Sequence, residues 1–147
     1  MKIAIVSSMF NEEISNNLIC GAMQRYKELT KEDFNQSYLY KVSGAFEIPF
    51  FVKKILNNKL DKFDAIVTLG CVIKGETAHF EHISESVTKA IMTLNLKNST
   101  NIPVLYGILT AYKYEQALNR CLQNTSNKGY EVMESAIKMV DLNNSLD

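Results

Sequence analysis

The sequence predicts a single α/β domain in which a four-stranded parallel sheet lies between two layers of helices. Three observations support this prediction. The chain has 147 residues, the size of one ordinary domain, so we expect residues 1–147 to fold as one unit. Apolar residues make up 46% of it and charged residues 22%, near the averages of globular proteins. Short apolar runs alternate with segments of helical periodicity, which is typical of a parallel sheet with helical crossovers.

The predicted strands are nearly continuous apolar runs, rich in Ile, Val, Leu and Tyr. They cover Ile3 to Ser8, Tyr38 to Val42, Ala65 to Ile73 and Pro103 to Thr110. Continuous rather than alternating apolar residues indicate strands that helices cover on both faces. Ligands bind such sheets outside the carboxyl ends of the strands, so the loops after these four strands are the places to search for a site.

Helical periodicity fills the segments between the predicted strands. The apolar positions of the first three helices run from Ile14 to Leu29, from Ile48 to Leu56 and from Ile83 to Leu94. After the last strand we expect a short helix around Tyr114 to Leu122 and a longer one with apolar positions from Val132 to Val140. Strand and helix therefore alternate along the chain, and the crossovers are expected to be right-handed.

The charges of the chain are balanced, with 16 basic and 16 acidic residues and no block of one sign. This distribution argues against nucleic acid and against an anionic membrane as partners, and it permits identical subunits to associate. Near the N-terminus, Met1-Lys2 precedes an apolar run, Ile3 to Val6, that is too short for a signal peptide or a membrane span. We therefore expect a cytoplasmic protein.

The three cysteines, Cys20, Cys71 and Cys121, are widely spaced, and each lies in an apolar periodic segment. They form no Cys-x-x-Cys pair, so we expect three buried thiols in a reducing compartment. The alternative is a reactive nucleophile, which would need a nearby base, and the sequence offers only His79 and His82 for that duty.

Two loops at predicted strand ends carry candidate binding residues. After the first strand, Phe10 precedes Asn11, a candidate helix N-cap. The Phe10 ring is either ordinary core or a stacking platform for a planar ligand. After the second strand, Gly44 permits a close approach between backbone and ligand, and Glu47 opens the next helix. The Glu47 carboxylate is either a charge favoured by the helix dipole or an acceptor for ligand hydroxyls.

The third strand ends in the segment Lys74 to Glu81, which contains a glycine turn, Thr77 as a cap and the start of a helix. Free N–H groups at a helix start bind anions, and a phosphate monoester fits better than a nucleotide because the known nucleotide motifs are absent. His79 lies in the first turn beside this anion site and is the candidate acid and base. For His79 and His82, a metal pair and a structural or exposed histidine are the alternatives.

Arg120 and Lys128 flank an irregular stretch, Cys121 to Asn127, between the last two predicted helices. They are either solvated surface charges or a clamp for a phosphate. If they belong to the same site as the Gly75 loop, a neighbouring subunit could supply them.

Several separated motifs, taken together, resemble those of lumazine synthases in order and spacing over essentially the whole chain. They are Phe10-Asn11, Gly44 to Pro49, Leu69 to Glu81, Pro103 to Thr110, Glu115 to Ala117 with Arg120, and Asn127 to Gly129. The resemblance implies a flavodoxin-like α/β/α fold and a transferase of riboflavin biosynthesis. Its reaction would condense 5-amino-6-(D-ribitylamino)uracil with 3,4-dihydroxy-2-butanone 4-phosphate, giving 6,7-dimethyl-8-ribityllumazine, phosphate and water, the penultimate step of the pathway. A non-catalytic flavin or lumazine binder on the same fold is the alternative.

The resemblance also implies a quaternary structure and a set of site residues. It implies no metal or organic cofactor, a homopentamer or a multiple of pentamers with each active site between adjacent subunits, and riboflavin synthase as a candidate partner. The residues implied to contact the pyrimidine and its ribityl chain are Phe10, Ala45, Phe46, Glu47, Val72, Ile73 and Tyr106, the last standing where the family usually has Phe. Those implied to hold the phosphate are Gly75, Glu76, Thr77, Arg120 and Lys128. His79 would shuttle protons, and Glu131 would orient it.

The sequence departs from the family pattern at four of the positions considered. Ser43 replaces a proline, Lys74 an arginine, His82 an aromatic residue and Asn124 a lysine. The aromatic ring, the histidine and the arginine of the implied site are retained.

Overall fold

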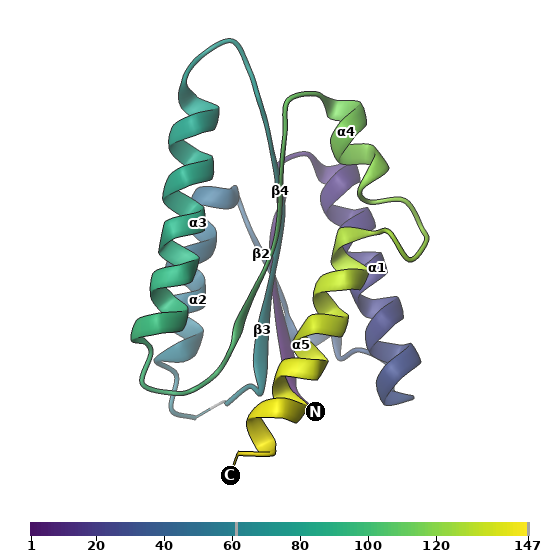
Figure 1. The fold of residues 1–147 in the computed structure, drawn as a ribbon, viewed down its shortest axis with the longest axis vertical. Coiled ribbons are helices and arrows are strands. Elements are labelled where there is room, and N and C mark those ends of the chain that lie inside the picture. Colours follow the sequence, from purple (N-terminus) through teal and green to yellow (C-terminus); the bar gives the residue numbers. More distant parts are fainter. Residues whose placement is uncertain (61, 147) are drawn as a thin grey trace.

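The computed structural model describes residues 1–60 and 62–146, and these form three layers. The strands are β1 (Ile3–Ser8), β2 (Leu39–Val42), β3 (Ala65–Ile73) and β4 (Val104–Ala111). They are all parallel and are arranged in the order β2-β1-β3-β4. One face of the sheet is covered by α2 (Ile48–Leu56) and α3 (His79–Lys97), and the other by α1 (Glu12–Thr30), α4 (Tyr114–Asn119) and α5 (Lys128–Asn144) (Figure 1). The predicted three-layer, flavodoxin-like fold is confirmed.

The element bounds differ from the predictions only near the ends. β2 begins one residue later than predicted, because the single-turn helix η1 (Gln36–Tyr38) includes Tyr38. β4 begins after Pro103, whose carbonyl oxygen still accepts a hydrogen bond from the Ile66 N–H at 2.9 Å. Proline has no N–H to contribute to a ladder, so it lies at the strand's start. A second single-turn helix, η2 (Ala45–Glu47), leads directly into α2.

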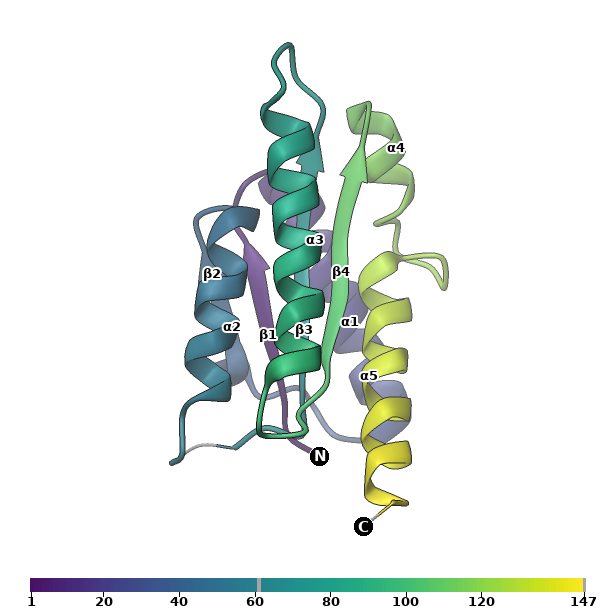
Figure 2. The ribbon, with the colours of Figure 1, turned by 60° about the vertical axis from the view of Figure 1, so that its left-hand side comes forward.

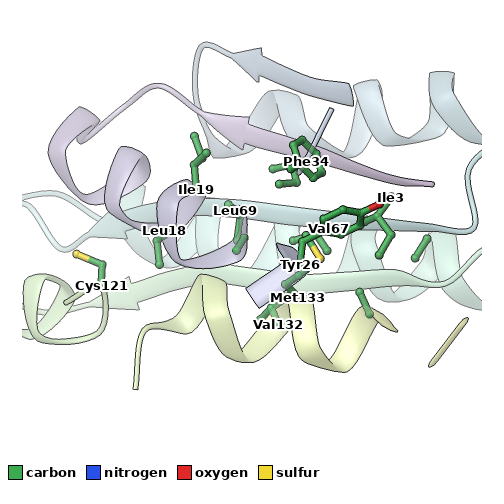
Figure 3. Packing of buried hydrophobic residues seen from close by; sticks show 14 of the residues in the cluster. Ile3, Leu18, Ile19, Tyr26, Phe34, Val67, Leu69, Cys121, Val132 and Met133 are labelled. Carbon is green, nitrogen blue, oxygen red and sulfur yellow. The ribbon is translucent and has the colours of Figure 1, made fainter. Parts of the chain in front are cut away.

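The core consists of two apolar clusters, one on each face of the sheet. Along β1, Ile3 and Ile5 belong to the cluster under α1 and α5, whereas Ala4 and Val6 belong to the cluster under α2 and α3. Figure 3 shows part of the first cluster, in which Leu18, Leu69 and Met133 lie among α1, the sheet and α5. Because both faces of each strand are covered, the strands have the continuous apolar sequences from which they were predicted.

The start of α5 is locked against α1 by a buried asparagine and a glycine. The Asn127 side-chain oxygen accepts hydrogen bonds from Gly129 N at 2.8 Å and Tyr130 N at 3.2 Å, which caps the helix. Its amide donates to the Asn17 carbonyl at 3.1 Å. A Cβ atom at Gly129 would overlap the Leu18 carbonyl, so the close approach of the two helices depends on this glycine. These contacts fix the part of α5 that carries Lys128 and Glu131.

The outer sides of α1 and α5 are joined by a network of charged groups around Arg25. Its guanidinium contacts Glu134 at 2.7 Å and Glu28 at 3.0 Å, and Nη1 donates to the Tyr130 hydroxyl at 2.8 Å. Hydrogen bonds, from Tyr130 first and also from Gln24 and Arg25, lower the pKa of Glu28. Hydrogen bonds from Lys138 first and then from Arg25 lower the pKa of Glu134. Both carboxylates are therefore held in the charged form.

The prediction of three buried thiols is confirmed for Cys71 and Cys121 but is wrong for Cys20, which is exposed. The buried side of α1 is set by Leu18, Ile19 and Ala22, and position 20 points away from it. Burial raises the pKa of the Cys71 thiol to about 12. A thiolate nucleophile at Cys71 is therefore disfavoured. None of the helices within residues 1–60 and 62–146 is long and apolar enough to cross a bilayer.

Candidate active site

A cavity of about 610 Å³ opens at the carboxyl ends of β1, β2 and β3, beside the start of α3. Its volume is in the range of small-molecule sites, and its walls are mainly apolar and aromatic. Most of the predicted site residues line it: Phe10, Ala45, Phe46, Glu47, Val72, Ile73, Gly75, Thr77 and His79. The cavity therefore lies at the carboxyl ends of the strands, where the sequence predicted the site.

Two aromatic rings stand at this cavity without being part of the core. Phe10 is 69% exposed and Phe46 is 62% exposed, although the cavity is lined by both. The interpretation of Phe10 as an ordinary core residue is therefore wrong. Exposed rings on a concave apolar surface are suited to stacking against a planar ring.

Glu47 occupies the η2 turn, where it has a structural contact. Its Oε2 atom accepts a hydrogen bond from Gly44 N at 2.9 Å, and its own N–H bonds to the Gly44 carbonyl at 3.3 Å. The side chain is exposed, and in the part of the chain that the structure describes its Oε1 atom has no hydrogen-bond donor. Glu47 thus closes the turn with one oxygen, and within the described residues the other oxygen is left without a donor.

The β3–α3 loop extends beyond the end of the sheet (Figure 2). Its base is fixed by a hydrogen bond from Lys74 N to the Ala111 carbonyl of β4 at 2.9 Å. Beyond that point Gly75, Glu76 and Thr77 are exposed, and a Cβ atom at Gly75 would meet nothing within 4 Å. The Thr77 hydroxyl accepts a hydrogen bond from His79 N at 3.4 Å, but the N-cap of α3 is Ala78 and makes no side-chain capping bond, so the predicted Thr77 cap is wrong. The loop and the α3 start present free N–H groups, a suitable environment for an anion.

His79 is the first residue of α3, and its exposed side chain lines the cavity. Its imidazole forms no hydrogen bond or ion pair with any residue of 1–60 or 62–146. The ring is therefore available to a ligand. His82, one turn further, is exposed and lies outside the cavity lining. Across the described residues, no group of three or more His, Cys, Asp or Glu side chains is placed to hold a metal ion.

The remaining predicted residues do not line the cavity within one chain. Arg120 ends α4, and its Nη2 atom donates to Glu131 Oε2 at 3.0 Å. Lys128 Nζ lies 3.6 Å from the same carboxylate oxygen. These three residues belong to the α4–α5 face of the sheet, opposite the face that α3 covers (Figure 1). No lysine or arginine is found among the described residues of the cavity wall.

Tyr106 and Glu76 are also outside the wall of the cavity. Tyr106 lies on β4, an edge strand, and its hydroxyl is 2.9 Å from Thr88 Oγ1 of α3. Burial raises the pKa of Tyr106, so the phenol stays neutral. Glu76 lies in the exposed β3–α3 loop.

Comparison with known proteins bears directly on this arrangement. A sequence profile of the 6,7-dimethyl-8-ribityllumazine synthase family matches residues 1–144. The chain belongs to this family. Enzymes named 6,7-dimethyl-8-ribityllumazine synthase from Limosilactobacillus reuteri (strain DSM 20016) and from Campylobacter jejuni (strain 81-176) are each 41% identical to it. The matches span 146 and 145 residues, 99% of this chain and 91% of each relative. The resemblance inferred from separated motifs is confirmed.

This lumazine synthase family member has three cavity residues that the motif-based search did not assign. They are Cys71, Phe80 and Ile83. Phe80 and Ile83 are three residues apart on α3, and this helical spacing next to His79 was the available signal. Cys71 lies next to Val72 in β3, and its backbone makes a contact considered below.

Proposed function

We propose that the chain condenses 5-amino-6-(D-ribitylamino)uracil with 3,4-dihydroxy-2-butanone 4-phosphate to form 6,7-dimethyl-8-ribityllumazine, phosphate and water. The observation that carries this proposal is the juxtaposition at one cavity of two exposed aromatic rings, an exposed helix start, and a histidine without a hydrogen-bond partner among the described residues. Membership of the lumazine synthase family supports it. The two ends of the cavity fit the two substrates, one planar and one phosphorylated.

The pyrimidine is proposed to bind at the apolar end. Phe10 would stack on the ring, while Val72 and Ile73 form the side of the pocket. Ala45 and Phe46 would offer backbone groups of the η2 turn. Glu47 would accept hydrogen bonds from ribityl hydroxyls through the carboxylate oxygen that its turn leaves unused. Tyr106 of an adjacent subunit would complete this pocket.

The phosphate is proposed to bind at the start of α3, on the N–H groups of Gly75, Glu76 and Thr77. A phosphate carries about two negative charges near neutrality, so backbone dipoles alone are a weak partner for it. Cations are absent from the described cavity wall, whereas Arg120 and Lys128 lie partly exposed on the opposite face of the sheet. We propose that an adjacent subunit supplies them, so that each active site is shared between two chains.

The chemistry requires a group that both gives and takes protons. The 5-amino group attacks the carbonyl carbon, one water leaves as the imine forms, and phosphate is then eliminated. The ribitylamino nitrogen next attacks the remaining carbonyl carbon, and loss of a second water closes the ring of the product. His79 would donate a proton to the departing oxygen and accept one from carbon or nitrogen. Glu131 is proposed to orient the His79 imidazole across the subunit interface. Holding the two substrates together would supply much of the rate.

A shared site requires a homo-oligomer, and we propose a pentamer or a multiple of pentamers. The balanced charge of the chain does not oppose such an assembly. Residues 1–147 are proposed to be a single domain that works in the cytoplasm without a metal or organic cofactor. Riboflavin synthase, which would use the product, is a candidate partner.

The test of this function is direct. The purified protein is incubated with both substrates while lumazine absorbance and fluorescence are recorded, with a protein-free reaction as the reference. We expect product above the uncatalysed rate and a lower turnover for His79→Ala, with substrate binding less affected. Binding of the lumazine without turnover would instead identify a non-catalytic binder, and unchanged turnover of His79→Ala would exclude His79 as the proton shuttle.

A further inference from the structure

We infer that Asn11 is a positioning residue of the candidate active site, which holds the Phe10 ring at the cavity by linking its loop to β3. The inference rests on the proposed function. It holds that Asn11 determines the affinity for the pyrimidine substrate indirectly, through Phe10. Phe10 is 69% exposed, so packing of its ring contributes little to its position. The backbone of the β1–α1 loop must therefore place it.

The end of β3 leaves a carbonyl group for this loop to use. β1 pairs with β3 only as far as Ser7 with Leu69, whereas β3 continues to Ile73. Ile66 in β3 and Lys74 just after its end donate their N–H groups to the Pro103 and Ala111 carbonyls on the β4 side, so the backbone groups of even-numbered residues face β4. Successive residues of a strand alternate, so the Cys71 carbonyl points to the side where β1 has already ended.

The Asn11 side chain fills this position. Its Nδ2 atom donates to the Cys71 carbonyl at 3.2 Å. The backbone of Asn11 is left-handed, with φ 56 and ψ 61, a conformation that asparagine tolerates better than most other non-glycine residues. Although Asn11 occupies the N-cap position of α1, as predicted, its side chain makes no capping hydrogen bond. The Asn11 amide therefore binds the β3 backbone instead of capping α1.

Phe10 is held from both sides by this loop. Met9 N donates to the Val42 carbonyl at 2.8 Å, and the Phe10 carbonyl accepts from Ser15 Oγ at 3.1 Å. Asn11 adds the contact to β3, and both Cys71 and the ring of Phe10 border the cavity. Asn11 thus links the Phe10 loop to the part of the cavity wall that Cys71 forms.

The principal variant is Asn11→Gly, which keeps a left-handed backbone accessible and removes only the amide. In steady-state assays we expect its KM for 5-amino-6-(D-ribitylamino)uracil to rise about three- to tenfold, the factor that one neutral hydrogen bond supports. Its kcat and its KM for the butanone phosphate should stay within about twofold of the wild type, because Phe10 does not contact the phosphate. Asn101→Gly is the matched control, since Asn101 has the same φ of 56 and does not line the cavity.

A double-mutant cycle separates positioning from direct contact. If Asn11 acts through the ring, Asn11→Gly should have no further effect on this KM in a Phe10→Ala background. An undiminished effect in that background would overturn the inference, as would an unchanged KM in the single variant. Asn11→Asp provides a second variant, which should raise the same KM because its carboxylate repels the Cys71 carbonyl. Absence of product with wild-type protein would instead refute the proposed function, so the two failures are distinguishable.

Discussion

Arg120 donates a hydrogen bond to Glu131 at 3.0 Å, on the face of the sheet opposite the helix that begins with His79. Lys128 shares the same carboxylate oxygen. The three side chains are partly exposed, so their ion pairs contribute little to folding. Under the proposed function, these side chains would form a cationic site that the phosphate bound at a neighbouring subunit's cavity can approach.

This arrangement predicts a selective defect for Arg120→Ala. Loss of a charged hydrogen-bond donor should raise KM for the butanone phosphate about 10- to 100-fold. The affinity for ribitylaminouracil should change little, because that substrate carries no phosphate. Lys138→Ala is the control, since Lys138 is an exposed cation of α5 paired with Glu134. Equal effects on both substrates would contradict a phosphate role for Arg120.

Substitution by alanine should affect stability very differently at Gly129 and at Gly75. Gly129→Ala places a methyl group against the Leu18 carbonyl and should destabilise the fold by about 1–3 kcal/mol or more, because α1 and α5 must separate. Gly75→Ala meets no neighbour and should change the free energy of unfolding by less than about 0.5 kcal/mol. Chemical unfolding followed by circular dichroism measures both, and similar losses would show that the helix contact is not critical. For Gly75→Ala we expect a higher KM for the butanone phosphate and an unchanged KM for the other substrate.

The network around Arg25 predicts acid sensitivity. Hydrogen bonds lower the pKa values of Glu28 and Glu134 in the folded chain, so these carboxylates stabilise the fold above the unfolded pKa, about 4.3. That contribution should be lost as the pH falls below this value towards the folded pKa values. Glu134→Gln should reduce the slope of stability against pH in this window, whereas Glu115→Gln on α4 should not. An unchanged slope in Glu134→Gln would exclude the network as a source of acid sensitivity.

The cysteines predict an order of chemical modification. Cys20 is exposed, whereas burial raises the pKa of Cys71 to about 12 and also raises that of Cys121. An alkylating reagent at mildly alkaline pH should therefore modify Cys20 first, as peptide mass spectrometry would reveal, and leave turnover intact. Fast modification of Cys71 in the folded protein would argue that its thiol is more accessible than its burial indicates.

Local sequence patterns predicted the fold well because each strand is buried on both faces and therefore reads as an apolar run. β1 and β3 were predicted with their observed bounds. His79 was predicted to lie in the first turn of α3, ahead of the first apolar position at Ile83, and the helix does begin at His79, although its N-cap is Ala78 rather than Thr77. Cys20 was misassigned because it lies between buried Ile19 and Gly21, and the apolar periodicity alone does not show that this one position faces solvent.

The candidate site was predictable where its residues follow strand ends and less so where contacts cross elements. Phe10, Glu47 and His79 follow three different strands, and the fold brings them to one cavity. The hydrogen bond between Asn11 and Cys71 joins residues 60 positions apart, so no local sequence pattern could predict it. Arg120 and Lys128 lie on the opposite face of the sheet, so their proposed role beside His79 depends on an assembly of subunits.

The shared site is tested most directly by mixing the subunits of two impaired variants and assaying them at a butanone phosphate concentration below the KM of the Arg120 variant. His79→Ala and Arg120→Ala chains are co-expressed with different tags, the mixed oligomers are purified through both tags, and lumazine formation is compared with that of each variant alone. If His79 and Arg120 act from adjacent subunits, about one quarter of the sites in a random mixture combine both intact residues, and activity should return to roughly that fraction of the wild type. Activity no higher than that of the separate variants would contradict the account, because a site built within one chain gains nothing from mixing.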